Sequence, residues 1–463
     1  MFRMTVSFCA LFGSMLFISK LIVETNAQER TTFPPNALRE PVGRYKSDVK
    51  VQSSTKSTKT EKATVKSVLD TTTQGSTEVQ LSTEKKTPVG KAGKAQTDKA
   101  QNGNAKTDKA HTANAKTPKT KTDRVEKLTA KQLKLKQDLR QTLAHYYFRP
   151  SSIDDHSPWG IMHCLIAYGV DTNIVVRGRK LNAIGWLCWN GESYGLQLFY
   201  TQNGELQTRR GPGVQGHDGQ FLSMLAQSRV PRDYKLRVDG QTFTVMDLVR
   251  HEQKTCHAGT ELTFKLIGLV HYLKSDAKWK NEYGEDWSIP RLIQEELKQP
   301  VVGAACGGTH RMMGFSYAVR KREKRKEPFT GQWLRAKKYV DAYHKYTFKL
   351  QNENGTFSSN FFASRGDWGG PARRLETTGH TLEWLVYSLP KSQLDDPRVV
   401  KAVRYLNDLL WKNRQMKWGI GPKGHALHAL ALYDERRFGG EPGKRASQLR
   451  AALIAAKKDR ATR

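Results

Sequence analysis

The chain has 463 residues, 37% of them hydrophobic, and its 77 Lys and Arg residues against 44 Asp and Glu residues give a formal net charge of +33. No nucleic-acid-reading motif accompanies this charge, so nucleic acid is not an expected partner, whereas an acidic polysaccharide or another polyanion is. The basic excess extends beyond the N-terminal part, because residues 141–463 carry 50 basic and 31 acidic residues, a net charge of +19.

Residues 1–27 have the pattern of a secretory signal peptide. Arg3 precedes an apolar run over residues 6–18, and the small residue Ala27 marks a cleavage position. Lys20 interrupts the run, so an uncleaved anchor is the alternative. No later stretch approaches the ~20 apolar residues of a membrane-spanning helix. We therefore expect a secreted or periplasmic protein that is soluble once the signal is removed.

Residues 28–124 form a low-complexity segment rich in Lys and Thr, with loose repeats such as QTDKA at Gln96 and NAKTDKA at Asn104. Between Lys46 and Leu143 there is no Phe, Trp or Tyr, so this segment cannot bury a core of its own. We expect a disordered, positively charged tether. Charge alone does not decide between a solvated spacer and an arm that binds polyanions.

A glycine followed by an apolar, helix-like run recurs along residues 125–458, most clearly in TTGHTLEWLVYSL and PKGHALHALALYD. The glycines that begin these runs are Gly160, Gly216, Gly259, Gly308, Gly379 and Gly424. A loop insertion at about 358–376 lengthens one interval. Another interval between these glycines contains aromatic residues and Asn-Gly turns at about 173–210, a pattern that predicts a small β insertion.

Between the glycine runs lie more amphipathic helical patterns, such as RAKKYVDAYHKYTFKLQ and PRVVKAVRYLNDLLWKN. An apolar helix alternating with an amphipathic one predicts an inner and an outer wall. About six such pairs predict an all-α fold, an α/α toroid with a small β insertion, preceded by the disordered tail. An open helical-repeat superhelix is the alternative.

Two segments support this architecture by resemblance. Gln351-x-x-x-Gly355-x-Phe357 and Gln415-x-x-x-Gly419 look like a degenerate form of the Gln-Trp motif of terpenoid cyclases. From about residue 128 to 458 the chain resembles the α/α-toroid superfamily, which includes terpenoid cyclases, protein prenyltransferases and toroidal polysaccharide lyases. The Asp-x-Asp-Asp motif of protonating cyclases is absent, and the zinc ligands of prenyltransferases do not map onto this chain. The resemblance therefore implies a fold and no particular activity.

The first turns of inner helices would meet at one end of a toroid, and here they carry ionisable residues. These are His163, His217, Asp218, Cys256, His257, Glu261, Cys306, His310, His380, Glu383, His425 and His428. Taken singly, each histidine is explained as a residue that caps its own helix, with the glycine turning the chain inward. Taken together, they predict a functional site.

Proton abstraction from an acidic sugar needs a base, an acid and a cation that neutralises the carboxylate. The candidate catalytic residues are His310, His380, Glu383, His425 and Tyr317, with Tyr387 as a second candidate acid. The candidate substrate-binding residues are Asp218, Glu261, Asp367, Trp368, Arg373 and Arg374; with Arg311, the last two are the candidate neutralising cations. The Gly-rich loop RGDWGGPARR offers an aromatic platform and a cationic clamp.

Two further chemistries are open. Zinc could be held by His380, Glu383, His425 and His428, although no H-E-x-x-H string is present. Glycoside hydrolysis would need two carboxyl groups across the cavity, from Asp218, Glu261 or Glu383. We predict neither a cofactor nor a metal ligand.

The four cysteines after residue 27, which are Cys164, Cys188, Cys256 and Cys306, permit two disulfides in three pairings and include no C-x-x-C pair. The leading hypothesis is an exported toroid that acts on acidic polysaccharide as a lyase. The alternative is a non-catalytic helical-repeat scaffold that binds a polymer or protein at the cell surface.

Overall fold

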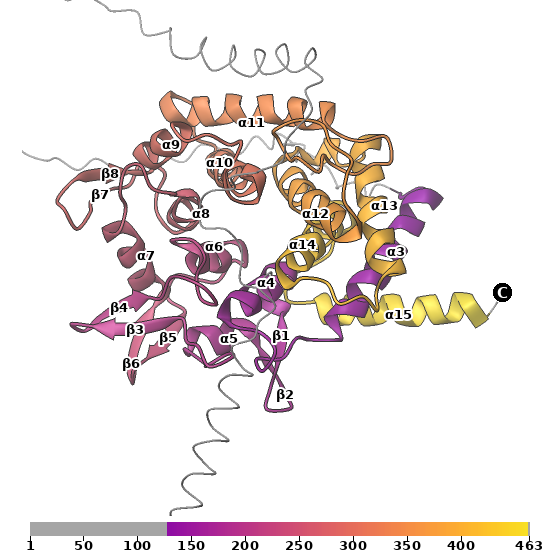
Figure 1. Cartoon of the computed structure of the whole chain (residues 1–463), viewed down its shortest axis with the longest axis horizontal. Coiled ribbons are helices and arrows are strands. Elements are labelled where there is room, and N and C mark those ends of the chain that lie inside the picture. The colour runs from indigo at the N-terminus through magenta and orange to yellow at the C-terminus, as the bar shows by residue number, and fades with distance from the viewer. Residues whose placement is uncertain (1–126, 462–463) are drawn as a thin grey trace, which may run out of the picture.

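The computed structural model describes residues 127–461. The signal peptide predicted at residues 1–27 and the tether predicted at 28–124 lie outside the described residues. Within those described, the chain is mostly helical, with 13 α-helices and four small antiparallel hairpins. Figure 1 shows the helices in two concentric layers around a common centre.

The inner layer consists of helices seen end-on in Figure 1. They are α4 (Pro158–Tyr168), α6 (Gln220–Gln227), α8 (Thr263–Tyr272), α10 (Thr309–Lys324), α12 (Pro371–Ser388) and α14 (Ile420–Phe438). The outer helices are α3 (Ala130–Tyr147), α5 (Ala183–Cys188), α7 (Val245–Lys254), α9 (Ile289–Leu297), α11 (Gly331–Lys349) and α13 (Pro397–Lys412). The last helix, α15 (Arg445–Ala461), packs along α3. Short 3₁₀ turns, η1 (Gly169–Asp171), η2 (Ala305–Gly308) and η3 (Lys391–Gln393), join some of them.

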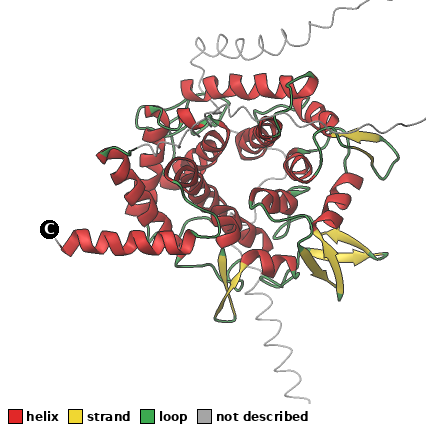
Figure 2. Ribbon diagram, turned by 180° about the vertical axis from the view of Figure 1, so that it is seen from behind, coloured by secondary structure: helices red, strands yellow, loops and turns green. Residues whose placement is uncertain are grey.

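The inner helices contact one another in chain order, and the last of them returns to the first. α4 contacts α6, which contacts α8, and the series continues through α10 and α12 to α14, which packs extensively on α4. Figure 2 shows the same arrangement from behind. The two segments that meet at this seam are more than 250 residues apart in the sequence. Helix α14 is therefore held between its sequence neighbour α12 and the distant α4.

The recurring glycines let inner helices approach each other. A β-carbon at position 424 would lie 2.2 Å from the carbonyl oxygen of His163, and one at Gly379 would lie 3.0 Å from the α-carbon of Ala426. The sequence interpretation that these glycines turn the chain inward is wrong at both positions, since each lies inside a helix. Their lack of a side chain brings the following histidines, His380 and His425, close together.

The two walls differ in burial as the alternating pattern predicts. In α10 every residue from Thr309 to Val319 is buried, and in α12 so is every residue from Thr377 to Val386. Outer helices bury one stripe only. In α13 that stripe is Val399, Ala402, Val403, Leu406, Asn407 and Leu410, with three- and four-residue spacing.

Local signals in the sequence fix several helix ends. Thr129 and Gln132 form a reciprocal capping box at the start of α3. Asp396 caps α13 by accepting a hydrogen bond from the amide of Arg398, with Pro397 at the first helical position. Gln351 donates to the carbonyls of Gly355 and Arg398, which ties the end of α11 to the next outer helix.

Four two-stranded antiparallel hairpins project from the helical layers. They pair β1 (Asn173–Val176) with β2 (Arg179–Asn182), β3 (Phe199–Gln202) with β4 (Glu205–Thr208), β5 (Lys235–Val238) with β6 (Gln241–Thr244), and β7 (Lys278–Lys280) with β8 (Asp286–Ser288). The first two lie in the predicted β insertion, with α5 between them. The other two were not predicted, although the Asp239-Gly240 dipeptide between β5 and β6 is a known hairpin signal.

None of the four cysteines in the described part of the chain forms a disulfide. Across residues 127–461, no helix combines the length and apolarity that crossing a bilayer requires.

Candidate functional site

The ionisable residues of the glycine runs occupy several depths along the inner helices. Because α12 begins at Pro371, His380 lies in its third turn, whereas His310 is the second residue of α10. His217 precedes α6 altogether. The helix-capping interpretation of the histidines is wrong for the inner helices, whose N-cap residues are Ser157, Gly219, Leu262, Gly308, Gly370 and Gly419.

Five imidazoles from different parts of the chain nevertheless meet, and we call them the histidine cluster: His163, His217, His310, His380 and His425. His310 is at its middle, with ring centroids 5.8 Å from His217, 5.5 Å from His380 and 5.2 Å from His425. His380 and His425 stack at 3.9 Å. His163 lies 5.4 Å from His425 across the seam.

Glu383 anchors one side of the cluster. Its two carboxylate oxygens accept hydrogen bonds from Nδ1 of His425, at 2.7 Å, and from Nδ1 of His428. Burial alone would raise the pKa of this carboxyl, but the two neighbouring imidazoles hold the pKa far below its usual value. The residues predicted as zinc ligands at this position therefore satisfy one another by hydrogen bonds, with His380 stacked alongside.

His310 and His380 are buried imidazoles with unused nitrogen atoms. His310 is 8% exposed and His380 is 2% exposed. Among residues 127–461, neither ring nitrogen of His310 has a hydrogen-bond partner, and Nε2 of His380 has none either. Nδ1 of His380 lies 2.7 Å from the carbonyl oxygen of Glu376. Burial, reinforced by neighbouring imidazoles, lowers the pKa of both residues well below its usual value, so both rings are neutral at neutral pH.

A second carboxylate–imidazole pair lies on the more exposed side of the histidine cluster. Nδ1 of His217 is 2.6 Å from Oε2 of Glu261, and 13% of the His217 side chain is exposed. Burial raises the pKa of Glu261, but the hydrogen bond from His217 and nearby arginines lower it below its usual value overall. Asp218, which follows His217 directly in the sequence, pairs with Arg210 at 3.0 Å. The predicted residue Glu261 thus contacts His217, whereas the predicted Asp218 is its neighbour in the sequence.

The predicted loop residues form a rim beside His380. The Arg373 guanidinium lies 5.1 Å from the ring centroids of both Phe361 and Trp368, and 54% of Trp368 is exposed. Phe361 in turn is 6.3 Å from His380. The predicted Asp367 is paired with Arg374 at 3.2 Å. The Arg373 guanidinium and the Phe361 ring therefore link the exposed tryptophan to the histidine cluster.

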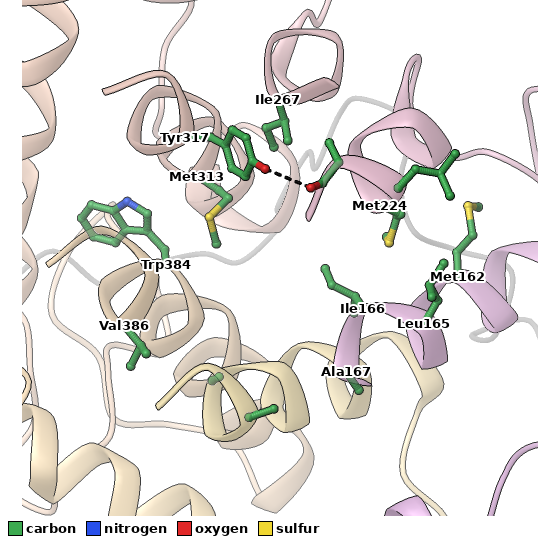
Figure 3. Packing of buried hydrophobic residues seen from close by; sticks show 14 of the residues in the cluster. Met162, Leu165, Ile166, Ala167, Met224, Ile267, Met313, Tyr317, Trp384 and Val386 are labelled. Atoms are coloured by element: carbon green, nitrogen blue, oxygen red, sulfur yellow. Dashed lines mark hydrogen bonds between the residues drawn. The ribbon is translucent and has the colours of Figure 1, made fainter. Parts of the chain in front are cut away.

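The centre of the cluster is tight. Thr309, His310, Met313, Glu383 and His425 contribute to a pocket whose free volume is about 20 Å³, the space of one or two water molecules. Ile166, Met224 and Ile267 close it on the apolar side, where Figure 3 shows them with Met313 around the space between the inner helices. Only a water-sized ligand fits at the deepest point.

Tyr317 lies apart from the cluster. Its hydroxyl donates to the carbonyl oxygen of Ala226 at 3.0 Å, the dashed contact in Figure 3, and lies 2.6 Å from Nδ1 of His271. Its ring stacks on Tyr387. Burial raises the pKa of Tyr317 well above its usual value. This environment fits a tyrosine packed in the core with a satisfied hydroxyl better than the predicted role of Tyr317 as an acid.

Two site residues were not singled out by sequence reasoning. Arg210 follows β4 and reaches Asp218, and the signal was its place in TRRGPGVQGHD just before the glycine run. Cys306 was included among the ionisable residues of the predicted inner-helix first turns, but it was given no role. Its thiol joins His310 and His380 in a group whose ligand atoms all lie within 4.8 Å of one another.

Comparisons of this chain with protein-family models, curated proteins and solved structures found no match.

Proposed function

We propose that the six helix pairs constitute an α/α toroid and that the protein acts on acidic polysaccharide at the exposed side of the histidine cluster, by a lyase-type elimination. The fold assignment is supported by the return of α14 to α4 and by the two-walled burial pattern. The functional assignment depends on one observation above all, which is the partly exposed His217–Glu261 pair.

A carboxylate that holds one imidazole nitrogen leaves the other nitrogen as an oriented base. Glu261 accepts from Nδ1 of His217, so Nε2 is available for a substrate proton. In the proposed reaction Nε2 removes the proton α to the uronate carboxylate. The carbon–oxygen bond to the leaving sugar then breaks, a carbon–carbon double bond forms, and the imidazolium returns its proton to the leaving oxygen. His217 replaces the tyrosines as the source of that proton.

The uronate carboxylate must be neutralised for its α-proton to become acidic. Arg210, 56% exposed at its side chain and paired with Asp218, supplies an exposed cation on this side. The rim formed by Trp368 and Arg373 offers an aromatic face and a positive charge to a neighbouring sugar. Because the deepest space holds only water-sized ligands, the polymer would lie across the exposed side of the histidine cluster and not enter the centre.

The test is turnover on a panel of acidic polysaccharides, followed through the unsaturated uronate that elimination creates, with neutral polysaccharides alongside. His217→Gln is expected to remove turnover while the melting temperature stays unchanged. The matched control is His257→Gln, which removes another imidazole paired with a carboxylate, that of Glu282 at 3.0 Å. It should keep full turnover.

Two results would contradict this function. Equal turnover in His217→Gln and in the parent would remove His217 as the base. Tight binding of acidic polysaccharides with no unsaturated product in the parent would replace the lyase with the non-catalytic scaffold, the second function that the sequence left open.

A further inference from the structure

The residues deepest in the histidine cluster are not explained by the proposed elimination. His310 and His380 are too buried to reach a polymer, and three of their ring nitrogens are buried without a hydrogen-bond partner among the residues that the structure describes. Leaving a buried polar atom unsatisfied costs about 1–3 kcal/mol. A ligand bound by several of these neighbouring nitrogen atoms would remove this cost and stabilise the folded chain.

The orientation of His380 indicates what kind of ligand this is. Its Nδ1 donates to the carbonyl oxygen of Glu376 at 2.7 Å, which leaves Nε2 as a bare lone pair. No donor in the described part of the chain forms a hydrogen bond with that lone pair. An imidazole held through one nitrogen by a backbone carbonyl, with its other nitrogen directed into a buried site, has the arrangement typical of metal-ligating histidines.

The third member of the group is a thiol. Cys306 lies in η2, immediately before α10, and four residues before His310. Its backbone is in the left-handed region, with φ of 48°, and the following Gly307 packs so closely that a β-carbon there would lie 2.1 Å from the Phe361 ring. The loop above His380 therefore fixes the turn that presents the sulfur atom.

From these contacts we infer that Cys306, His310 and His380 bind a zinc ion. One sulfur and two nitrogen ligands suit Zn²⁺, which takes four tetrahedral ligands at about 2.3 Å from sulfur and about 2.0–2.1 Å from nitrogen. Ligand atoms around such an ion stand roughly 3.3–3.5 Å apart. The three atoms here lie within 4.8 Å of one another, so rotations of the side chains complete the site.

The fourth ligand would be water. The free volume of about 20 Å³ beside His310 has room for it, and the ionised Glu383 lines the same pocket. A carboxylate beside the ion offsets the single positive charge that remains after the Cys306 thiolate has bound. Three protein ligands with one open position are typical of catalytic zinc sites, whereas structural sites have four protein ligands. The inference does not depend on the polysaccharide proposal.

The experiment measures metal in the full-length protein without any substrate. The protein is stripped with a chelator, dialysed against Zn²⁺ and then against buffer, and the zinc retained is counted. One equivalent per chain is expected. Loading with Co²⁺ in place of Zn²⁺ is expected to give a thiolate-to-cobalt charge-transfer absorption, which reports a sulfur ligand directly.

The variants are Cys306→Ser, His310→Ala and His380→Ala, each of which should lower the affinity for zinc at least a hundredfold. The control is Cys164→Ser, which replaces a thiol of α4 that contacts the Ser151 hydroxyl, and this variant should bind zinc as the parent does. Circular dichroism and melting temperature establish that each variant is folded.

A measurement on the unmodified chain keeps the inference falsifiable if a variant does not fold. Zn²⁺ is expected to protect Cys306, but not Cys164, from alkylation in the native protein, as read by peptide mass spectrometry. Retention of clearly less than one equivalent of zinc would overturn the inference. So would equal alkylation of Cys306 with and without Zn²⁺, or full zinc binding by folded Cys306→Ser.

Discussion

The α-carbon of Gly424 in α14 lies so close to His163 in α4 that a β-carbon at position 424 would stand 2.2 Å from the His163 carbonyl oxygen. This contact joins the last inner helix to the first. It also brings the His163 and His425 rings to 5.4 Å from each other. The glycine is thus required where two helices distant in sequence close the arrangement that gathers the histidines.

Gly424→Ala is therefore expected to lower the free energy of unfolding by about 3 kcal/mol, because its methyl group meets backbone and not a movable side chain. Denaturant unfolding measures this. The control is Gly185→Ala in α5, where the nearest atom to a new β-carbon is 3.9 Å away. That change should be neutral or slightly stabilising, since alanine favours a helix over glycine. Equal stabilities of the two variants would contradict the close contact.

The buried ion pair of Lys265 and Glu252 predicts that removing one partner destabilises the protein more than removing both. Both side chains are 1% exposed, and Nζ of Lys265 donates to Glu252 at 2.6 Å and to Thr255 at 2.6 Å. Lys265→Met leaves the carboxylate buried without its partner, so we expect a loss of roughly 3–5 kcal/mol. Adding Glu252→Leu should recover much of that loss. A double variant less stable than Lys265→Met would show that the pair does not act as a unit.

His344 predicts how stability depends on pH. Burial lowers its pKa from 6.5 to about 4, and its Nε2 contacts the Ser388 hydroxyl while the ring stacks on Trp384. Between pH 6.5 and about 4 the unfolded chain therefore binds a proton that the folded chain does not, and stability falls as pH falls. His344→Gln should reduce that fall by roughly 3 kcal/mol. Parallel curves for parent and variant over this window would argue against a buried neutral His344.

The exposed rim predicts a selective loss of ligand binding. Trp368→Ala should weaken binding of an acidic oligosaccharide roughly five- to tenfold, about 1 kcal/mol, without changing the melting temperature. Trp189→Ala is the matched control, because Trp189 is 65% exposed and also has an arginine, Arg237, over its ring. Calorimetric titration compares them. Equal affinities of the two variants would remove the rim from the binding surface.

Much of the helical layout follows from sequence patterns that act locally. Hydrophobic periodicity located α11 and α13, and the Asp396-Pro397 pair marks the start of α13. The start of α12 at Pro371 was missed because its first turn is polar and was interpreted as part of a loop. The β5–β6 and β7–β8 hairpins were missed because strands of three or four residues carry almost no alternation.

For the site, the sequence predicted that the histidines lie close together, but not which groups each histidine contacts. Recurrence of histidine after glycine indicated that the rings meet, and this was confirmed for the histidine cluster. The partners of each ring could not be predicted, because they depend on the depth of each residue along its helix. Tyr317, seven residues after His310, was a candidate catalytic residue, but its hydroxyl contacts His271 and Ala226.

The central claim is that α4 and α14 meet and so bring distant histidines to one centre. Its most direct test is a nuclear Overhauser experiment on protein with isotope-labelled histidine rings, the signals being assigned with His163→Gln and His425→Gln. With ring centroids 5.4 Å apart, a cross-peak between His163 and His425 is expected. Assigned signals from both rings in the folded protein, with no cross-peak between them, would contradict the closure of the inner helices.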